Sequence, residues 1–328
     1  MSFIIDDQTR AIMCQRTTQS LCFYGNKFTN ENVEKFMSHS IQMIGAWGNI
    51  FDTLTLTPKN GFKSTDYKFS LQTLQKNFNA SQCSQISAIK TWLTEWNDDY
   101  KIRINFNREF AIITFADEDI NLNTSEISKQ LIGFASLLQC PYSIYFEVPY
   151  ANIPSMFAEG IVVGNCCKYF LQNFAENTHE KAMRFCRWAD TGLPEKVYLR
   201  GVIRDVYPMN LLCRPQAFFS FQGKPLLECV RSGMIGGTIE EITPERFLWT
   251  VPQSDIPVVT EKCEKAGFLF NQLKDVPGDI LWEDPDVAEY HKGDAQREAN
   301  GKIIQKFVEA AKNTNEIPDP SELLKIFE

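Results

Sequence analysis

The segment 101–117, KIRINFNREFAIITFAD, constrains the fold of this chain more than any other stretch. Ile102, Ile104 and Phe106 alternate with polar residues, and after a turn a second apolar run begins. A period of two is typical of a strand with one buried face, so the segment predicts two strands joined by a turn. A chain that contains this pair must build a sheet and cover its apolar face with further elements.

Helical and strand-like patterns surround this pair. Thr29 is a good N-cap residue, and apolar residues recur at helical spacing from Val33 to Ile44, which predicts a helix over about 30–46. The other elements expected in this half are strands at 51–57 and 142–148 and helices at 86–97 and 127–138. The order strand, strand, helix, strand indicates a mixed α+β layer.

The second half repeats the mixture. The elements expected there are helices at 166–188, 225–231 and 255–266 and strands at 196–203, GTIEEI and RFLWTV. We therefore predict an α+β fold of two helix-over-antiparallel-sheet units, at residues 1–150 and 151–273. Seven acids between positions 274 and 294, and a later helical pattern, predict an acidic linker and helical tail at 274–328.

Charge and cysteine usage limit the compartment and the partners. The chain has 33 basic and 41 acidic residues, a net charge of -8, which argues against binding to nucleic acid. The first residues do not have the basic and apolar pattern of a signal peptide, so we do not expect export. The sequence has no run of about 18 apolar residues, so we do not expect a transmembrane helix. Ten cysteines without C-x-x-C spacing fit a reducing compartment, and we expect a cytoplasmic protein.

Motifs for catalysis or metal binding are missing from the sequence. The three histidines, His39, His179 and His291, each stand alone, and the adjacent pair at 166–167 does not have the spacing of two ligands to one metal. Carboxylates cluster at 117–119 and at Glu240-Glu241, but nothing beside them supports acid–base or metal chemistry. We assign no catalytic residue, metal or cofactor.

One polar cluster follows the strand expected at 196–203. It contains Arg204, Asp205, Tyr207 and Asn210 in a turn-like stretch. In a structural role Asp205 bonds the amides of the turn while Arg204 or Arg214 neutralises it. The alternative is a recognition loop for a partner.

This cluster also carries a family resemblance. RGVIRDVYPMNLL, RFLWTVP and IPVVTEKCEKAGFLF, together with the early segment CFYGNKFTNENVEKFMSHSIQMIGAWGN, resemble immunity proteins of bacterial polymorphic toxin systems of the type VI secretion kind. The resemblance implies a cytoplasmic protein that binds one cognate secreted toxin and neutralises it by occluding the active site. No catalytic residue carries over, because such proteins act mostly by occlusion.

An acidic chain suits such a partner, because an acidic surface is attracted to a toxin that is basic near its active site. We expect the toxin contact in the acidic stretch of the linker, at Trp282, Glu283, Asp284, Asp286 and Glu289. Two other classes stay open. One is a secreted effector or scaffold protein, and the other is an enzyme with an unrecognised carboxylate or cysteine site.

Overall fold

The computed structural model describes the region from residue 17 to residue 269, apart from residues 47, 49, 60–62, 92–99, 108–109, 117–119, 121, 150–153, 160–200, 202, 222 and 267. The chain divides into two compact units, residues 1–272 and 273–328, and all described residues lie in the first. The linker and tail predicted at 274–328 and the helix predicted at 166–188 lie outside the described residues.

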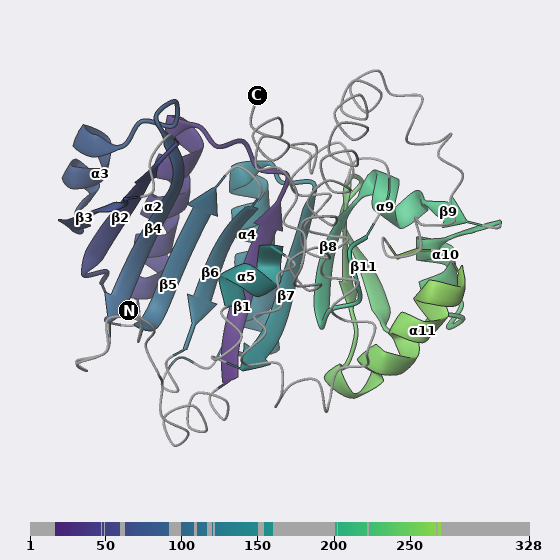
Figure 1. Cartoon of the computed structure of the whole chain (residues 1–328). Coiled ribbons are helices and arrows are strands. Elements are labelled where there is room, and N and C mark those ends of the chain that lie inside the picture. The colour runs from purple at the N-terminus through teal and green to yellow at the C-terminus, as the bar shows by residue number, and fades with distance from the viewer. Residues whose placement is uncertain are drawn as a thin grey trace, which may run out of the picture. The chain divides into compact units, whose positions relative to one another are not determined.

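A single large sheet organises the described region (Figure 1). Its ten strands are, in spatial order, β11 (Thr238–Thr243), β12 (Arg246–Thr250), β8 (Met209–Cys213), β7 (Tyr142–Pro149), β1 (Thr17–Tyr24), β6 (Phe110–Phe115), β5 (Tyr100–Asn107), β4 (Cys83–Thr91), β2 (Thr53–Pro58) and β3 (Thr65–Lys68). Every neighbouring pair is antiparallel. The predicted α+β class is confirmed, and because β7 pairs with β8, strands from both halves of the chain belong to one sheet.

Three helices cover one face of the sheet, which we call face A. They are α2 (Asn30–Gly45), α3 (Leu71–Asn77) and α4 (Thr124–Leu138). The predicted cap is present, since the Thr29 side chain accepts from the backbone N–H of Asn32 at 3.2 Å. At α4, Asn123 and Glu126 form a reciprocal capping box that fixes the start of the helix.

Aromatic side chains fill the core between face A and these helices. Phe23 of β1, Phe36 of α2 and Phe134 of α4 contact one another with ring centroids 5.3–6.1 Å apart. Phe106 of β5 joins them, 5.2 Å from Phe36 in an edge-to-face arrangement. Such pairs add about 0.5–1.5 kcal/mol each beyond the burial of their area. The alternating apolar residues that predicted the strands are therefore the ones that hold the helices.

The opposite face, face B, is covered in its C-terminal half. The covering helices are α5 (Pro154–Glu159), α9 (Arg214–Phe218), α10 (Leu226–Arg231) and α11 (Ile256–Ala266), and a short two-stranded ladder of β9 (Ser220–Phe221) and β10 (Lys224–Pro225) lies between α9 and α10 in sequence. Cys22 and Tyr24 of β1 point into this second core, while Leu21 and Phe23 point into the first. The central strands are thus buried on both faces.

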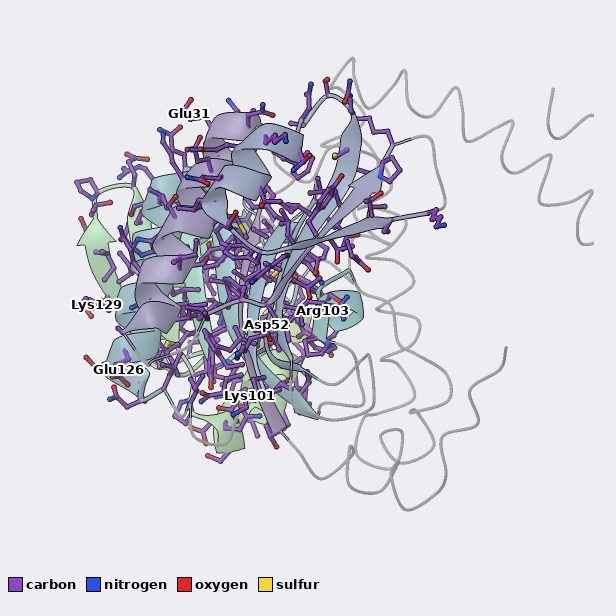
Figure 2. All side chains as sticks on the ribbon, turned by 90° about the vertical axis from the view of Figure 1, so that its left-hand side faces the viewer. Glu31, Asp52, Lys101, Arg103, Glu126 and Lys129 are labelled. Atoms are coloured by element: carbon purple, nitrogen blue, oxygen red, sulfur yellow. The ribbon has the colours of Figure 1, made fainter. Side chains whose placement is uncertain are left out.

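Charged side chains mark the two sides of the N-terminal half of the sheet (Figure 2). Glu31, Glu126 and Lys129 lie on helices α2 and α4, whereas Lys101 and Arg103 come from β5 and lie on the other side. Successive strand residues point to opposite faces, so the polar residues of β5 share face B while its apolar partners share face A. The alternation read from the sequence therefore separates two faces of the sheet.

The helix predicted at 86–97 is wrong in its first half. Residues 83–91 form strand β4, which pairs with β2 and β5 over most of its length. Ile86 and Ile89 have helical spacing, but Ile86 faces the first core while Ile89 lies opposite Arg103 on the other face. Pairing with two strands distant in sequence overrides the local spacing.

Replacing Ser143 by alanine is expected to stabilise the protein by about 1 kcal/mol. Ser143 is fully buried on β7 between Phe23 of β1 and Leu211 of β8, and among the described residues its hydroxyl has no hydrogen-bond partner. Removing an unpaired buried hydroxyl therefore relieves a desolvation cost, which urea denaturation measures.

Ser20 supplies the matched control. It is equally buried, but its hydroxyl lies 3.2 Å from that of Thr114 across the β1–β6 pair. Ser20→Ala leaves the Thr114 hydroxyl without this bond and is expected to cost about 1 kcal/mol. Equal effects of the two substitutions would contradict the assignment of Ser143 as unpaired.

Candidate protein-interaction surface

Exposed apolar side chains concentrate at the C-terminal end of the sheet. Five large hydrophobic residues are exposed in the described region, and three of them, Phe218, Met234 and Val258, come from the elements around the β11–β12 hairpin. Their exposed fractions are 44%, 50% and 57%. Exposed aromatic and methionine side chains are enriched at protein interaction sites.

The turn that presents Met234 is shaped by glycine. Gly233, Gly236 and Gly237 all have positive φ angles, a conformation that side-chain-bearing residues rarely adopt. A Cβ atom on Gly236 would lie 3.1 Å from Val259 of α11, so the turn lies directly against this helix, which also carries Val258. Within this turn Met234 is exposed, whereas its neighbour Ile235 is buried in the second core.

Acidic side chains accompany these apolar ones. Glu240 and Glu241 are exposed and point to opposite faces of β11, because Glu240 lies opposite the buried Leu248 and Glu241 opposite Phe247. Phe218 contacts the same Phe247, with ring centroids 5.8 Å apart. Arg231 approaches Glu241 only to 4.0 Å, with both side chains about half exposed, and such a pair contributes little. We call Phe218, Met234, Glu240, Glu241 and Val258 the hairpin surface.

The hairpin surface stands on a well-anchored support. Trp249 of β12 is fully buried, and its indole N–H donates to the carbonyl of Gly236 at 3.1 Å. Arg246 at the start of β12 donates to the carbonyl of Pro141 at 2.9 Å, which joins the hairpin to the beginning of β7. Because these elements are already ordered, binding a partner costs little conformational entropy on this side.

In the predicted cluster at 204–210, Tyr207 and Asn210 are buried, and Arg204 and Asp205 are half-buried. Arg204 donates through Nη1 to the hydroxyl of Tyr24 at 2.6 Å and to the carbonyl of Ala158 at 2.9 Å, and through Nη2 to the carbonyl of Phe157 at 2.5 Å. Its guanidinium also lies over the rings of Phe157 and Tyr207, at 5.3 and 6.0 Å from their centroids. Arg204 thus connects the loop to β1 and to the end of α5.

The other members of this cluster also make internal bonds. An oxygen of Asp205 accepts from the backbone N–H of Val206, as the structural interpretation of the sequence predicts. The amide of Asn210 donates to the carbonyl of Tyr207 at 2.8 Å, and burial raises the pKa of the Tyr207 hydroxyl above its ordinary value. The recognition role of this loop stays a prediction.

The acidic contact predicted at Trp282, Glu283, Asp284, Asp286 and Glu289 lies outside the described residues, as do His179, His291 and residues 117–119. His39 packs edge-to-face on Phe134 with ring centroids 4.4 Å apart, and burial lowers the pKa of its imidazole. The described cysteines are buried, and burial raises the pKa of Cys213 and Cys263.

The sequence interpretation identified neither Phe218, Met234 nor Val258 as a contact residue. Met234 lies between the glycines of a tight turn, but Ile235 beside it in the same turn is buried, so this pattern alone does not single out Met234. Phe218 and Val258 give no signal either, since each lies in an ordinary helical pattern and its exposure depends on the packing of that helix.

The described region contains neither a metal-binding cluster nor a membrane-spanning helix. No group of three or more histidine, cysteine or acidic side chains there could hold a metal ion. Among the helices of that region, none has the length and apolar character needed to cross a bilayer.

Comparison with known proteins does not assign this chain to a family. No protein family and no curated protein matches the sequence. Among solved structures, the chain is similar to the Pseudomonas aeruginosa T6SS protein PA0821, with a TM-score of 0.42 and 12% sequence identity, over 77% of this chain and 73% of that chain. A TM-score of this size at this identity establishes neither a common fold nor a common function.

Proposed function

We propose that this chain is a cytoplasmic immunity protein that binds a cognate secreted toxin and neutralises it by covering the toxin's active site. The observation that carries the proposal is the hairpin surface, where exposed Phe218, Met234 and Val258 and the exposed acids Glu240 and Glu241 all come from the β11–β12 hairpin and the elements around it. The resemblance of the sequence to immunity proteins agrees with a role in binding. The proposed partner is basic near its active site.

The chemistry of the hairpin surface suits tight occlusion. A few buried aromatic or aliphatic side chains carry most of the binding energy of a protein interface, and surrounding polar groups set its specificity. Acids beside these anchors accelerate association with a basic cleft, because opposite charges steer the encounter. Neutralisation by occlusion needs no turnover by this chain.

Co-expression tests the proposal in cells. The protein encoded by the neighbouring gene is expressed alone, with this chain, and with its Met234→Glu variant, and growth is scored. We expect growth arrest alone, rescue by the unchanged chain, and loss of rescue with Met234→Glu, because the substitution places a charge where an apolar contact forms. In calorimetry with the purified pair, the dissociation constant should rise at least about 30-fold, as for a hot-spot residue.

Ile50→Glu is the matched control. Ile50 is also exposed, but it precedes β2, at the opposite end of the sheet from β11. This variant introduces the same charge and should retain full rescue and affinity. A neighbouring protein that does not arrest growth, or rescue by Met234→Glu equal to that by Ile50→Glu, would contradict the proposal.

A further inference from the structure

Strand β11 ends the sheet on the side of the hairpin surface. In the sheet formed by the described residues it pairs with β12 alone, so every second residue directs its backbone N–H and C=O away from the sheet. The side chains of Thr238, Glu240, Glu241 and Thr243 are exposed. An open edge of this kind is a template for the addition of another strand.

The two ends of the sheet differ in how well they suit strand addition. At the far end, β3 has four residues. Strand β11 has six, four of them β-branched, and its register with β12 is regular from Thr238 to Glu241 before an irregularity at Thr243. Short edge strands resist pairing, so β11 is the better docking edge.

The charges of β11 select the partner. Antiparallel pairing of β11 with a second copy about a two-fold axis sets the residue at the axis opposite its own copy, so an axis at Glu240 or at Glu241 places a glutamate opposite a glutamate. Like charges directly opposite destabilise a strand pair, whereas opposite charges stabilise it. The edge therefore disfavours self-association and favours a strand with lysine or arginine at these positions.

We infer that β11 binds a basic strand of the partner protein by antiparallel addition to the sheet. The partner strand carries a lysine or arginine on each face, opposite Glu240 and Glu241. Its C-terminal end reaches the turn before Thr238, where Met234 offers an apolar contact. This inference rests on the proposed function in that it names the contact made by the same surface.

A charge-reversed copy of the chain is a suitable probe. The double variant Glu240→Lys/Glu241→Lys presents two lysines on the same strand, so in either of these registers the glutamate of an unchanged chain would face a lysine. Sedimentation velocity should show that each protein alone does not associate through this edge. The 1:1 mixture should associate at least about ten times more tightly, and less so in high salt.

Hydrogen exchange separates strand addition from other association. In the mixture the outward-facing amides of β11 should be protected, alternating along the strand with amides already bonded to β12. The control is Glu31→Lys/Glu34→Lys, which makes the same charge change on exposed positions of α2 and should give no association. Absence of association in the mixture, or association without protection of β11, would overturn the inference.

The outcomes separate this inference from the proposed function. If rescue depends on Met234 but the charge-reversed mixture does not associate, the immunity role stands and the strand contact is wrong. If the mixture associates with β11 protected but Met234→Glu rescues fully, the edge binds strands and the proposed role of the hairpin surface fails. If both hold, Glu240→Lys/Glu241→Lys should also lose rescue.

Discussion

Gly237→Ala is expected to lower the free energy of unfolding by at least about 3 kcal/mol. Gly237 has a φ angle of +77°, and a Cβ atom there would lie 2.6 Å from the carbonyl oxygen of Thr250 and 2.7 Å from the indole nitrogen of Trp249. Neither neighbour can yield, because Thr250 is held in the β11–β12 pair and the Trp249 ring is buried and bonded to Gly236. The substitution must therefore separate the turn from the hairpin.

Gly233→Ala isolates the contribution of backbone conformation. Its φ angle is nearly the same, +74°, but an added Cβ would meet nothing within 4 Å. The cost of a left-handed non-glycine residue alone is about 1–2 kcal/mol. Urea denaturation of both variants should give a difference of at least about 1 kcal/mol, attributable to the close approach at Gly237. Equal losses would show that the turn can move away from Trp249.

The sequence predicted those helices and strands whose conformation is determined by residues within the element itself. The cap at Thr29 and the capping box at Asn123 fix α2 and α4 from within four residues, and the alternation around Ile104 fixes β5. In each case the sequence pattern and the buried face agree. Strand β4 fails this criterion because its isoleucines have helical spacing, and only its pairing with β2 and β5 settles its conformation.

The continuity of the sheet has no local signal. Strands β7 and β8 are separated by 59 intervening residues, yet Ser143 and Tyr145 lie opposite Leu211 and Met209. Two apparent helix-and-sheet units are compatible with either one sheet or two, since the choice depends on which edge strands meet. The hairpin surface could not be predicted from the sequence for the same reason. The exposure of Phe218 and Val258 depends on how helices α9 and α11 pack against the sheet.

The polar cluster at 204–210 was recognised by residue type, but its partners are remote. Tyr24 lies 180 positions before Arg204. A sequence pattern can predict that an arginine beside a buried loop needs acceptors, yet it cannot name acceptors supplied by another strand and by the end of α5. The sequence therefore predicted a structural role for the cluster but not the residues that Arg204 contacts.

Arg204→Met is expected to destabilise the protein by about 3 kcal/mol, because hydrogen bonds to charged groups contribute about 1.5–3 kcal/mol each and partners left unpaired add to the loss. The Tyr24 hydroxyl and the carbonyls of Phe157 and Ala158 all lose their bond from the guanidinium. Arg204→Lys should fall in between, since an ammonium can replace one of these bonds but not the planar fork over the Phe157 ring.

Arg214→Met is the control. Arg214 is exposed, donates to the carbonyl of Pro244 at 3.2 Å and lies over the ring of Phe218 at 4.6 Å, so its loss should cost no more than about 1 kcal/mol. Thermal and urea denaturation measure both variants. Equal destabilisation would contradict the assignment of Arg204 as the link between the loop, β1 and α5.

The same Arg204 variant separates the two interpretations of the loop. At a temperature where Arg204→Met remains folded, a purely structural arginine leaves the affinity for the neighbouring protein unchanged, because the hairpin surface is built from other residues. A recognition loop would instead lose affinity in the folded variant. Since the three acceptors of Arg204 belong to this chain itself, we expect the first result: reduced stability with unchanged binding.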